Sequence, residues 1–245
     1  LGRSKVGVMA LVFDVTGSMA MFRKSYTTTS SVSFPFPPPT AVAGLLSAIV
    51  GFENGSSSDA CRAAFWEKMK GTRIALGILR SGTIGRHTIN FWNTKEPKKN
   101  PRIQIAHQFI FSPKYRVYVA GSIEPLLKPR LENGTFVYTP YLGVAYAIAD
   151  LFYIGCFDEG PLKIDTGVEI DSVVPWRDGM KIDVSASGGA FKERMPFVMD
   201  SERALKQVVD VLYSPSPDRK LHLIEKGEVH VARCGQDTIA WFPEW

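Results

Sequence analysis

The chain has 245 residues, of which 45% are hydrophobic and 22% charged, with a formal net charge of +5 at pH 7. This length and composition are typical of a globular protein with a sizeable core, as one large domain or two small ones. The longest apolar runs fall short of the roughly 20 residues that a membrane-spanning helix needs, which excludes that class.

The first predicted element is a buried strand from Val6 to Val15, a β-branched apolar run that stops at Thr16-Gly17. An apolar helix is predicted from Gly44 to Phe52, because its apolar residues have helical spacing. Thr40 is well placed to cap the N-terminus of this helix, after a loop that ends in Pro37-Pro38-Pro39.

The segment from Asp14 to Met19, DVTGSM, is similar to the Asp-x-Ser/Thr-x-Ser motif of metal-dependent adhesion sites. There, a carboxylate and two hydroxyls supply oxygen ligands to magnesium. That fold needs a helix directly after the motif and further alternating strand and helix units. Here the motif runs into the Pro-rich segment from Phe22 to Pro39, which cannot be a helix. We therefore predict no metal site.

The loop before the helix lies in a stretch, Val15 through Phe52, that contains no acidic residue. It offers cations, an aromatic ring and a run of hydroxyl groups, which suits a phosphate-bearing polymer. The alternative is an ordinary exposed loop. The residues of this loop that we predict to contact a polyanion are Arg23, Lys24, Tyr26, Thr27, Thr28, Thr29 and Ser30.

A short helix from Asp59 to Met69 and a strand from Thr72 to Leu79 are predicted next. The stretch from Arg80 to His107 then holds six Lys or Arg residues and only one acid, Glu96, with Ile, Phe and Trp interleaved. Two extended arms that meet at residues 96–101 predict a protruding β-hairpin.

Basic residues interleaved with aromatic ones provide phosphate contacts and base-stacking surfaces, the latter worth about 1–3 kcal/mol per base. The alternative is a surface hairpin whose Phe91 and Trp92 pack on the body of the protein. The predicted contact residues are Arg80, Arg86, His87, Phe91, Trp92, Asn93, Lys95, Lys98, Lys99, Arg102, Gln104 and His107.

Beyond the hairpin, a strand from Phe109 to Gly121 and a helix from Ser122 to Leu131 are predicted. From Cys156 onward the sequence changes to short strands divided by Gly and Pro, with one helix from Ser201 to Leu212. The predicted strands of this part are Gly167–Val174, Met180–Ser185, Leu221–Glu225 and Glu228–Ala232. We expect this part to be a smaller, mostly β subdomain.

The two halves of the chain differ in charge. Through Ala149 there are 18 Lys and Arg residues against 7 acids, whereas from Asp150 onward there are 11 against 17. Such asymmetry points to a polyanion partner for the first half, and a merely uneven solvated surface is the alternative.

The stretch FDVTGSMAMFRKSYTTTSSVSFPFPPPTAVAGLLSAIVG resembles the N-terminal signature of the CRISPR-associated Cas5 family, whose members hold the 5′ handle of CRISPR RNA (crRNA) in the Cascade complex. The pattern consists of a strand, a Phe-Arg segment, a Pro-Pro-Thr turn and a Gly-Leu-Leu-x-Ala-x-x-Gly helix. Here these elements are Phe22-Arg23, Pro38-Pro39-Thr40 and Gly44–Gly51. The segments Tyr138–Gly143 and Arg194–Phe197 also resemble family segments.

The resemblance implies an α+β fold. We expect a ferredoxin-like (RRM-like) βαββαβ domain over residues 1–155, with a protruding β-hairpin thumb at about residues 80–110. The smaller, mostly β C-terminal subdomain would cover residues 156–245.

The resemblance also implies a non-catalytic, crRNA-binding subunit of a type I Cascade surveillance complex, closest to subtype I-B. Such a complex serves antiviral defence or RNA-guided DNA targeting. The implied partners are the crRNA 5′ handle, the Cascade backbone subunit, the large PAM-recognising subunit and, indirectly, target DNA; no membrane and no cofactor are implied. Cys61, Cys156 and Cys234 are unpaired in spacing, and no signal peptide pattern opens the chain, so we expect reduced thiols in a cytoplasm.

The competing function is a metal-independent endoribonuclease that processes precursor crRNA, as some relatives do with Tyr, Lys and His. Such an enzyme needs a base for the ribose 2′-hydroxyl and cations for the charged transition state. The residues available for these roles are Tyr26, Lys24, His87 and His107, although they follow no defined catalytic spacing.

Overall fold

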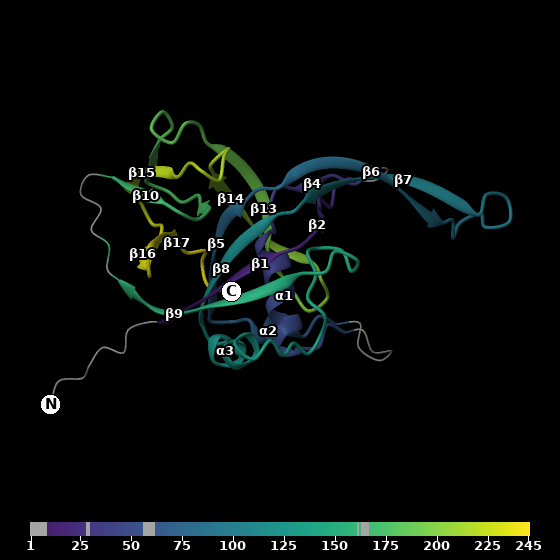
Figure 1. Ribbon diagram of the computed structural model, residues 1–245, viewed down its shortest axis with the longest axis horizontal. Helices are drawn as coiled ribbons and strands as arrows, with labels where there is room; N and C mark the ends of the chain where they lie inside the picture. Colours follow the sequence, from purple (N-terminus) through teal and green to yellow (C-terminus); the bar gives the residue numbers. More distant parts are fainter. Residues whose placement is uncertain (1–8, 28–29, 56–61, 161, 163–166) are drawn as a thin grey trace.

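A six-stranded antiparallel sheet forms the centre of the molecule (Figure 1). The computed structural model describes residues 9–27, 30–55, 62–160, 162 and 167–245. Across the sheet the strands lie in the order β17-β16-β9-β1-β8-β5. Their bounds are β1 Met9–Thr16, β5 Thr72–Arg80, β8 Lys114–Gly121, β9 Asp150–Gly160, β16 Val231–Cys234 and β17 Asp237–Ala240. The predicted α+β class is confirmed.

Strand β1 pairs with β8 on one edge and with β9 on the other. Its residues from Ala10 to Val15 are buried, because both faces of the sheet are covered at this point. A continuous apolar run rather than a strict alternation suits such a strand. The strand predicted from Val6 to Val15 is confirmed over its described part, and residues 6–8 lie outside the described residues.

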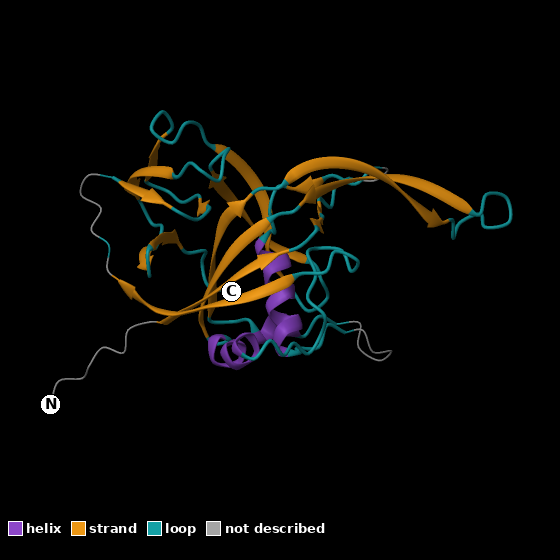
Figure 2. Cartoon of the chain, in the orientation of Figure 1, coloured by secondary structure: helices purple, strands orange, loops and turns teal. Residues whose placement is uncertain are grey.

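The helices lie on one side of the sheet (Figure 2). Leu11 and Phe13 of β1 share a buried core with Leu46 and Ile49 of one helix and Leu127 of another. None of the helices in the described residues is long and apolar enough to cross a membrane. Their bounds are α1 Pro39–Val50, α2 Phe65–Lys68 and α3 Glu124–Glu132.

Helix α1 begins at Pro39 and not at the predicted Gly44, and its N-cap is Pro38 and not Thr40. Proline suits the first helical turn, because its fixed φ is already helical and its missing N–H has no partner there. Helix α2 is also shorter than predicted. Of the helix expected from Asp59 to Met69 only Phe65–Lys68 is helical among the described residues, and residues 59–61 lie outside them.

The predicted hairpin is confirmed: β6 (Thr83–Trp92) and β7 (Arg102–Phe111) pair along their whole length and extend away from the sheet (Figure 1). The strand predicted from Phe109 to Gly121 is divided, because Phe109–Phe111 belongs to β7. Ser112, with φ of 52°, separates β7 from β8.

The helix expected from Ser201 to Leu212 is wrong: its residues 205–212 lie in the strand β14 (Leu205–Tyr213). It pairs with β13 (Phe191–Met199) and β11 (Val174–Pro175). Three valines within five residues favour a strand, and the long partner β13 supplies the hydrogen bonds that the isolated segment lacks. The remaining strands are β2 Met19–Ala20, β3 Phe22–Arg23, β4 Ser33–Phe34, β10 Val168–Ile170, β12 Met180–Asp183 and β15 Leu221–Lys226.

The C-terminal residues return to the central sheet. Strands β16 and β17 extend it beside β9, and the end of the chain covers the free edge of β5, where Phe242 N donates to Ile74 O at 2.8 Å. The expected boundary between residues 155 and 156 falls inside β9. The division into two domains remains a prediction.

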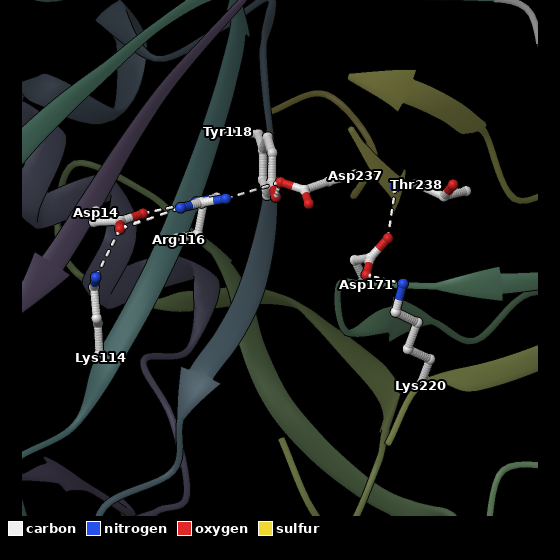
Figure 3. A network of polar contacts seen from close by, with 8 residues as sticks. All are labelled: Asp14, Lys114, Arg116, Tyr118, Asp171, Lys220, Asp237 and Thr238. Atoms are coloured by element: carbon white, nitrogen blue, oxygen red, sulfur yellow. Dashed lines mark hydrogen bonds and ion pairs between the residues drawn. The ribbon is translucent and has the colours of Figure 1, made fainter. Parts of the chain in front are cut away.

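A polar network joins the central strands to the C-terminal elements (Figure 3). Arg116 of β8 donates to Asp14 Oδ1 at 2.7 Å and to Asp237 Oδ2 at 3.1 Å, and Lys114 Nζ lies 3.0 Å from Asp14 Oδ2. Burial raises the pKa of Asp14, but the hydrogen bonds and charges of Arg116 and Lys114 outweigh burial and hold it below its ordinary value.

We predict that Asp14→Asn destabilises the fold by about 1–3 kcal/mol at neutral pH, because it leaves two cations short of their shared partner. Because the pKa of Asp14 is lowered, its carboxylate stabilises the fold fully at pH values above its ordinary pKa of 3.8. This stabilisation is lost as the pH falls through the lower pKa of the folded state. Urea unfolding should therefore show a gap between wild type and variant that narrows at acid pH. The exposed Asp158→Asn serves as the control, and an equal gap at all pH values would contradict the assignment.

Candidate nucleic-acid interface

The β6–β7 hairpin has two chemically different faces, because alternate residues of a strand point to opposite sides. The pairs Asn90–Gln104 and Trp92–Arg102 face each other across the strands, and Arg86 lies on the same side. We call Arg86, Asn90, Trp92, Arg102 and Gln104 the basic face. All five side chains are exposed, and Trp92 is 67% accessible.

The charges of the hairpin are largely unbalanced. Arg86, Lys95, Lys98 and Arg102 have no acidic partner among the described residues, and Lys99 lies 4.0 Å from Glu96 in an exposed pair. An exposed pair at this distance contributes little. The hairpin therefore presents a row of cations and one exposed indole ring to solvent.

The opposite face is aromatic and partly closed. His87 and His107 are cross-strand neighbours there, and the His107 ring stacks on Phe109 at 5.9 Å between centroids. Phe91 lies 5.3 Å from the same imidazole ring. His107 is only 8% exposed, and its Nδ1 lies 3.2 Å from the carbonyl oxygen of Ile105, so Nδ1 donates the proton. These three predicted contact residues thus lie on the other side from Trp92 and Arg102.

The fold brings the predicted loop to the root of the hairpin. Ser31 N donates to Ala106 O at 3.0 Å, and Gln108 N donates to Ser31 O at 2.9 Å. The Gln108 side chain accepts from Ser33 N at 3.0 Å. Ser31 and Gln108 position the loop against β7, although no sequence signal marks them, because their contacts depend on a register that only the folded hairpin has.

Within the loop, Arg23, Tyr26 and Ser30 are exposed, and Tyr26 is 72% accessible. Arg23 Nη2 donates to Thr27 O at 2.7 Å, which holds the turn, and Thr27 Oγ1 donates to Lys24 O at 2.8 Å. Thr28 and Thr29 lie outside the described residues. Arg23 and Tyr26 thus remain open to a ligand.

Lys24 is placed differently from Arg23. Its ammonium lies 2.9 Å from both carboxylate oxygens of Glu193, on β13, and 5.1 Å from the centroid of the Phe34 ring. The Lys24 side chain is 13% exposed. Lys24 therefore ties the loop to the C-terminal strands and is not an open phosphate-binding cation.

Two further predicted residues have local structural contacts. Arg80 Nε donates to Ser112 O at 2.5 Å at the base of the hairpin. Asn93 Oδ1 accepts from the backbone N–H groups of Lys95 and Glu96 at 3.1 and 3.3 Å, an Asx turn that shapes the tip. These contacts leave the Arg80 charge in place but occupy the Asn93 oxygen.

The segment similar to a metal-dependent adhesion motif does not gather ligands. Asp14 faces the two cations of the polar network, and Thr16 Oγ1 donates to Pro113 O at 2.8 Å. No group of three or more His, Cys, Asp or Glu side chains positioned to hold a metal ion occurs in the described part of the chain.

We predict that Lys24→Ala lowers the free energy of unfolding by about 1–3 kcal/mol, because Glu193 then keeps a half-buried charge without a partner. The adjacent Arg23→Ala is the matched control and should change stability by no more than about 0.5 kcal/mol, as an exposed surface substitution does. Thermal or urea unfolding checks both. Equal stability of the two variants would show that the Lys24–Glu193 pair contributes nothing.

Comparison with known proteins gives a family match for the first half of the chain. Residues 10–123, which include nearly all of β1, α1 and the whole hairpin, match a family model described as CRISPR-associated protein (Cas_Cas5). No curated protein matches the chain.

Two solved structures share the fold. A CRISPR protein from Archaeoglobus fulgidus aligns with a TM-score of 0.58 at 15% identity, over 95% of this chain and 98% of that one. A chain described as part of a CRISPR RNA-guided surveillance complex aligns with a TM-score of 0.53 at 13% identity, over 88% of this chain and 91% of that one. The chain is thus similar to the CRISPR-associated Cas5 family over residues 10–123, and it shares the fold of these two CRISPR proteins.

Proposed function

We propose that the chain is a non-catalytic subunit of a type I CRISPR Cascade surveillance complex and binds the 5′ handle of crRNA. The observation that carries this proposal is the basic face of the hairpin, whose cations have no acidic partners among the described residues. It lies next to the Arg23–Tyr26 loop, which Ser31 and Gln108 hold against β7.

The chemistry of this surface suits single-stranded RNA. Arg86, Arg102 and the tip lysines can contact phosphates, and exposed Trp92 can stack on a base, a contact worth about 1–3 kcal/mol. Asn90 and Gln104 are neutral donors and acceptors between them. Phosphate contacts of this kind provide affinity and position the strand.

The sheet topology supports a ferredoxin-like, RRM-like domain. The strands β9-β1-β8-β5 are in the order 4-1-3-2 along the chain, all neighbours are antiparallel, and α1 and α3 follow the first and third of these strands. A βαββαβ unit with right-handed crossovers has this order. The hairpin is inserted between the second and third strands.

The partners that we propose are the Cascade backbone subunit and the large PAM-recognising subunit, with target DNA as an indirect partner. Support comes from the likeness to a chain of a CRISPR RNA-guided surveillance complex. We propose that the hairpin tip meets the backbone subunit and that the acidic C-terminal part meets the large subunit, in a cytoplasmic complex closest to subtype I-B. Such a complex would act in antiviral defence or in RNA-guided DNA targeting.

The non-catalytic part of the proposal rests on the candidate residues themselves. His107 is nearly buried, with Nδ1 bound to a carbonyl, and the Lys24 ammonium is held by Glu193. A general base must reach the 2′-hydroxyl, and a stabilising cation must be open to the phosphate. Of the four residues that the endoribonuclease alternative would use, Tyr26 and His87 are exposed.

We predict that Arg86→Ala and Arg102→Ala each flatten the salt dependence of binding to CRISPR repeat RNA. Each lost phosphate contact should lower the slope of log K against log salt by up to about 0.7 for a single strand. Binding is measured by titration at several salt concentrations. Arg130→Ala, an equal charge change on α3, is the control. Slopes equal to that of wild type in both hairpin variants would remove the basic face from the interface.

We further predict that purified protein, incubated with labelled repeat RNA and EDTA, leaves the RNA intact on a denaturing gel. His87→Ala and His107→Ala should not change this result. Discrete cleavage that survives EDTA and disappears in either variant would instead establish the endoribonuclease.

A further inference from the structure

A cavity of about 390 Å³ lies at the root of the hairpin, where the turn between β5 and β6 faces the C-terminal strands. The hairpin side contributes Leu79, Gly82 and Ile84, and the C-terminal side contributes Phe191, Tyr213 and Pro215. Ligand sites typically have volumes of about 300–1,000 Å³ and apolar walls. The cavity can therefore hold a group of the size of a nucleobase.

The floor of the cavity belongs to the polar network of Figure 3. Asp237 Oδ2 accepts from Tyr118 Oη at 2.6 Å and from Arg116 at 3.1 Å, and Asp171 pairs with Lys220 at 2.7 Å. Both carboxylates are thus already neutralised. Such a floor suits an uncharged polar ring better than a phosphate group.

One acceptor of this floor remains available. The hydrogen bonds of the Asp237 side chain use Oδ2, and Oδ1 accepts none from the described residues. A carboxylate oxygen can accept a hydrogen bond from the exocyclic amino group of adenine, cytosine or guanine. The network fixes the position of Asp237 before any ligand arrives.

The cavity lies at the end of the basic face that is nearest the root of the hairpin. Ile84 lines the cavity. It lies on the same side of β6 as Arg86 and Trp92, because even numbers of residues separate the three along the strand. Arg219 lines the cavity on the other side, is exposed, and has no acidic partner among the described residues. Phosphates can thus remain outside on arginines while a base enters.

We propose that this cavity receives one unstacked base of the RNA strand that lies along the basic face. The proposal rests on the proposed function and adds a base-binding site to it. The apolar walls take the ring, the Asp237 carboxylate takes an amino group, and Arg219 holds the adjacent phosphate. Proteins that read single-stranded RNA commonly take up unstacked bases in this way.

The test uses the full chain and repeat RNAs in which 2-aminopurine replaces one nucleotide at a time. Binding should change the fluorescence strongly at one position. Ser214→Phe, which fills the cavity from its lining, should abolish that signal and weaken binding of unmodified RNA by about fivefold or more. Its salt slope should fall by no more than about 0.7, because only the single phosphate contact of Arg219 depends on entry of the base. Ser185→Phe, an exposed serine outside the lining, is the control.

The outcomes separate this inference from the proposed function. Salt-dependent RNA binding with no position-specific signal, and with Ser214→Phe equal to the control, overturns the base site alone. A protein that binds no RNA overturns both. If Ser214→Phe has a clearly lower melting temperature than wild type, Phe191→Ser takes its place. This substitution removes part of the cavity wall from an exposed position and must weaken binding in the same way.

Discussion

The antiparallel pairing of β5 with β8 at the edge of the central sheet determines where the hairpin can be. Ile74 faces Val119 and Leu76 faces Val117 across this pair. The last residue of β5, Arg80, and the first residue of β8, Lys114, lie side by side at one end of the pair. The chain between them does not make a tight turn but continues as β6 and β7, which form a separate sheet with β2 beyond this edge. The starting point of the hairpin is therefore set by a strand pair in which β1, buried on both faces, keeps β8 in register.

The cations of the body are paired with acidic residues, whereas most cations of the hairpin are not. In the body, Arg116 and Lys114 share Asp14, Arg73 pairs with Glu159, and Lys24 pairs with Glu193. Partly buried charges need such partners, because desolvation is costly. On the hairpin the cations stay in solvent, where an unpaired charge costs little and attracts a polyanion from a distance. The uneven distribution along the sequence thus becomes a spatial separation between a charge-balanced body and a cationic arm.

Sequence patterns predict the elements whose signal is local. The apolar run of β1, the alternation of β5 and the turn-rich Glu96–Pro101 between two extended arms are sufficient to predict these elements. The predictions that fail depend on long-range partners. β14 is a strand because β13 pairs with it, and Lys24 is not open to a ligand because it pairs with Glu193, which lies 169 positions further along the chain. The same limit applies to the interface. Residue types indicate the cationic segments, but the division of the hairpin into two faces, and the cavity at its root, follow only from register and tertiary packing.

The stability of the hairpin decreases from root to tip, and this affects how it can bind. Near the root, β7 has neighbours on both edges, since β2 and Ser31 pair on the side opposite β6. Beyond Ile105 the arm consists of β6 and β7 alone among the described residues, and an isolated two-stranded ribbon is marginally stable in water. The aromatic face, with Phe91 on the His107 ring, provides the packing there. A ligand or neighbouring subunit that covered this face would add a second layer to the outer arm, so that its ordering would be coupled to binding. The cavity, in contrast, lies at the root, where β7 has neighbours on both edges.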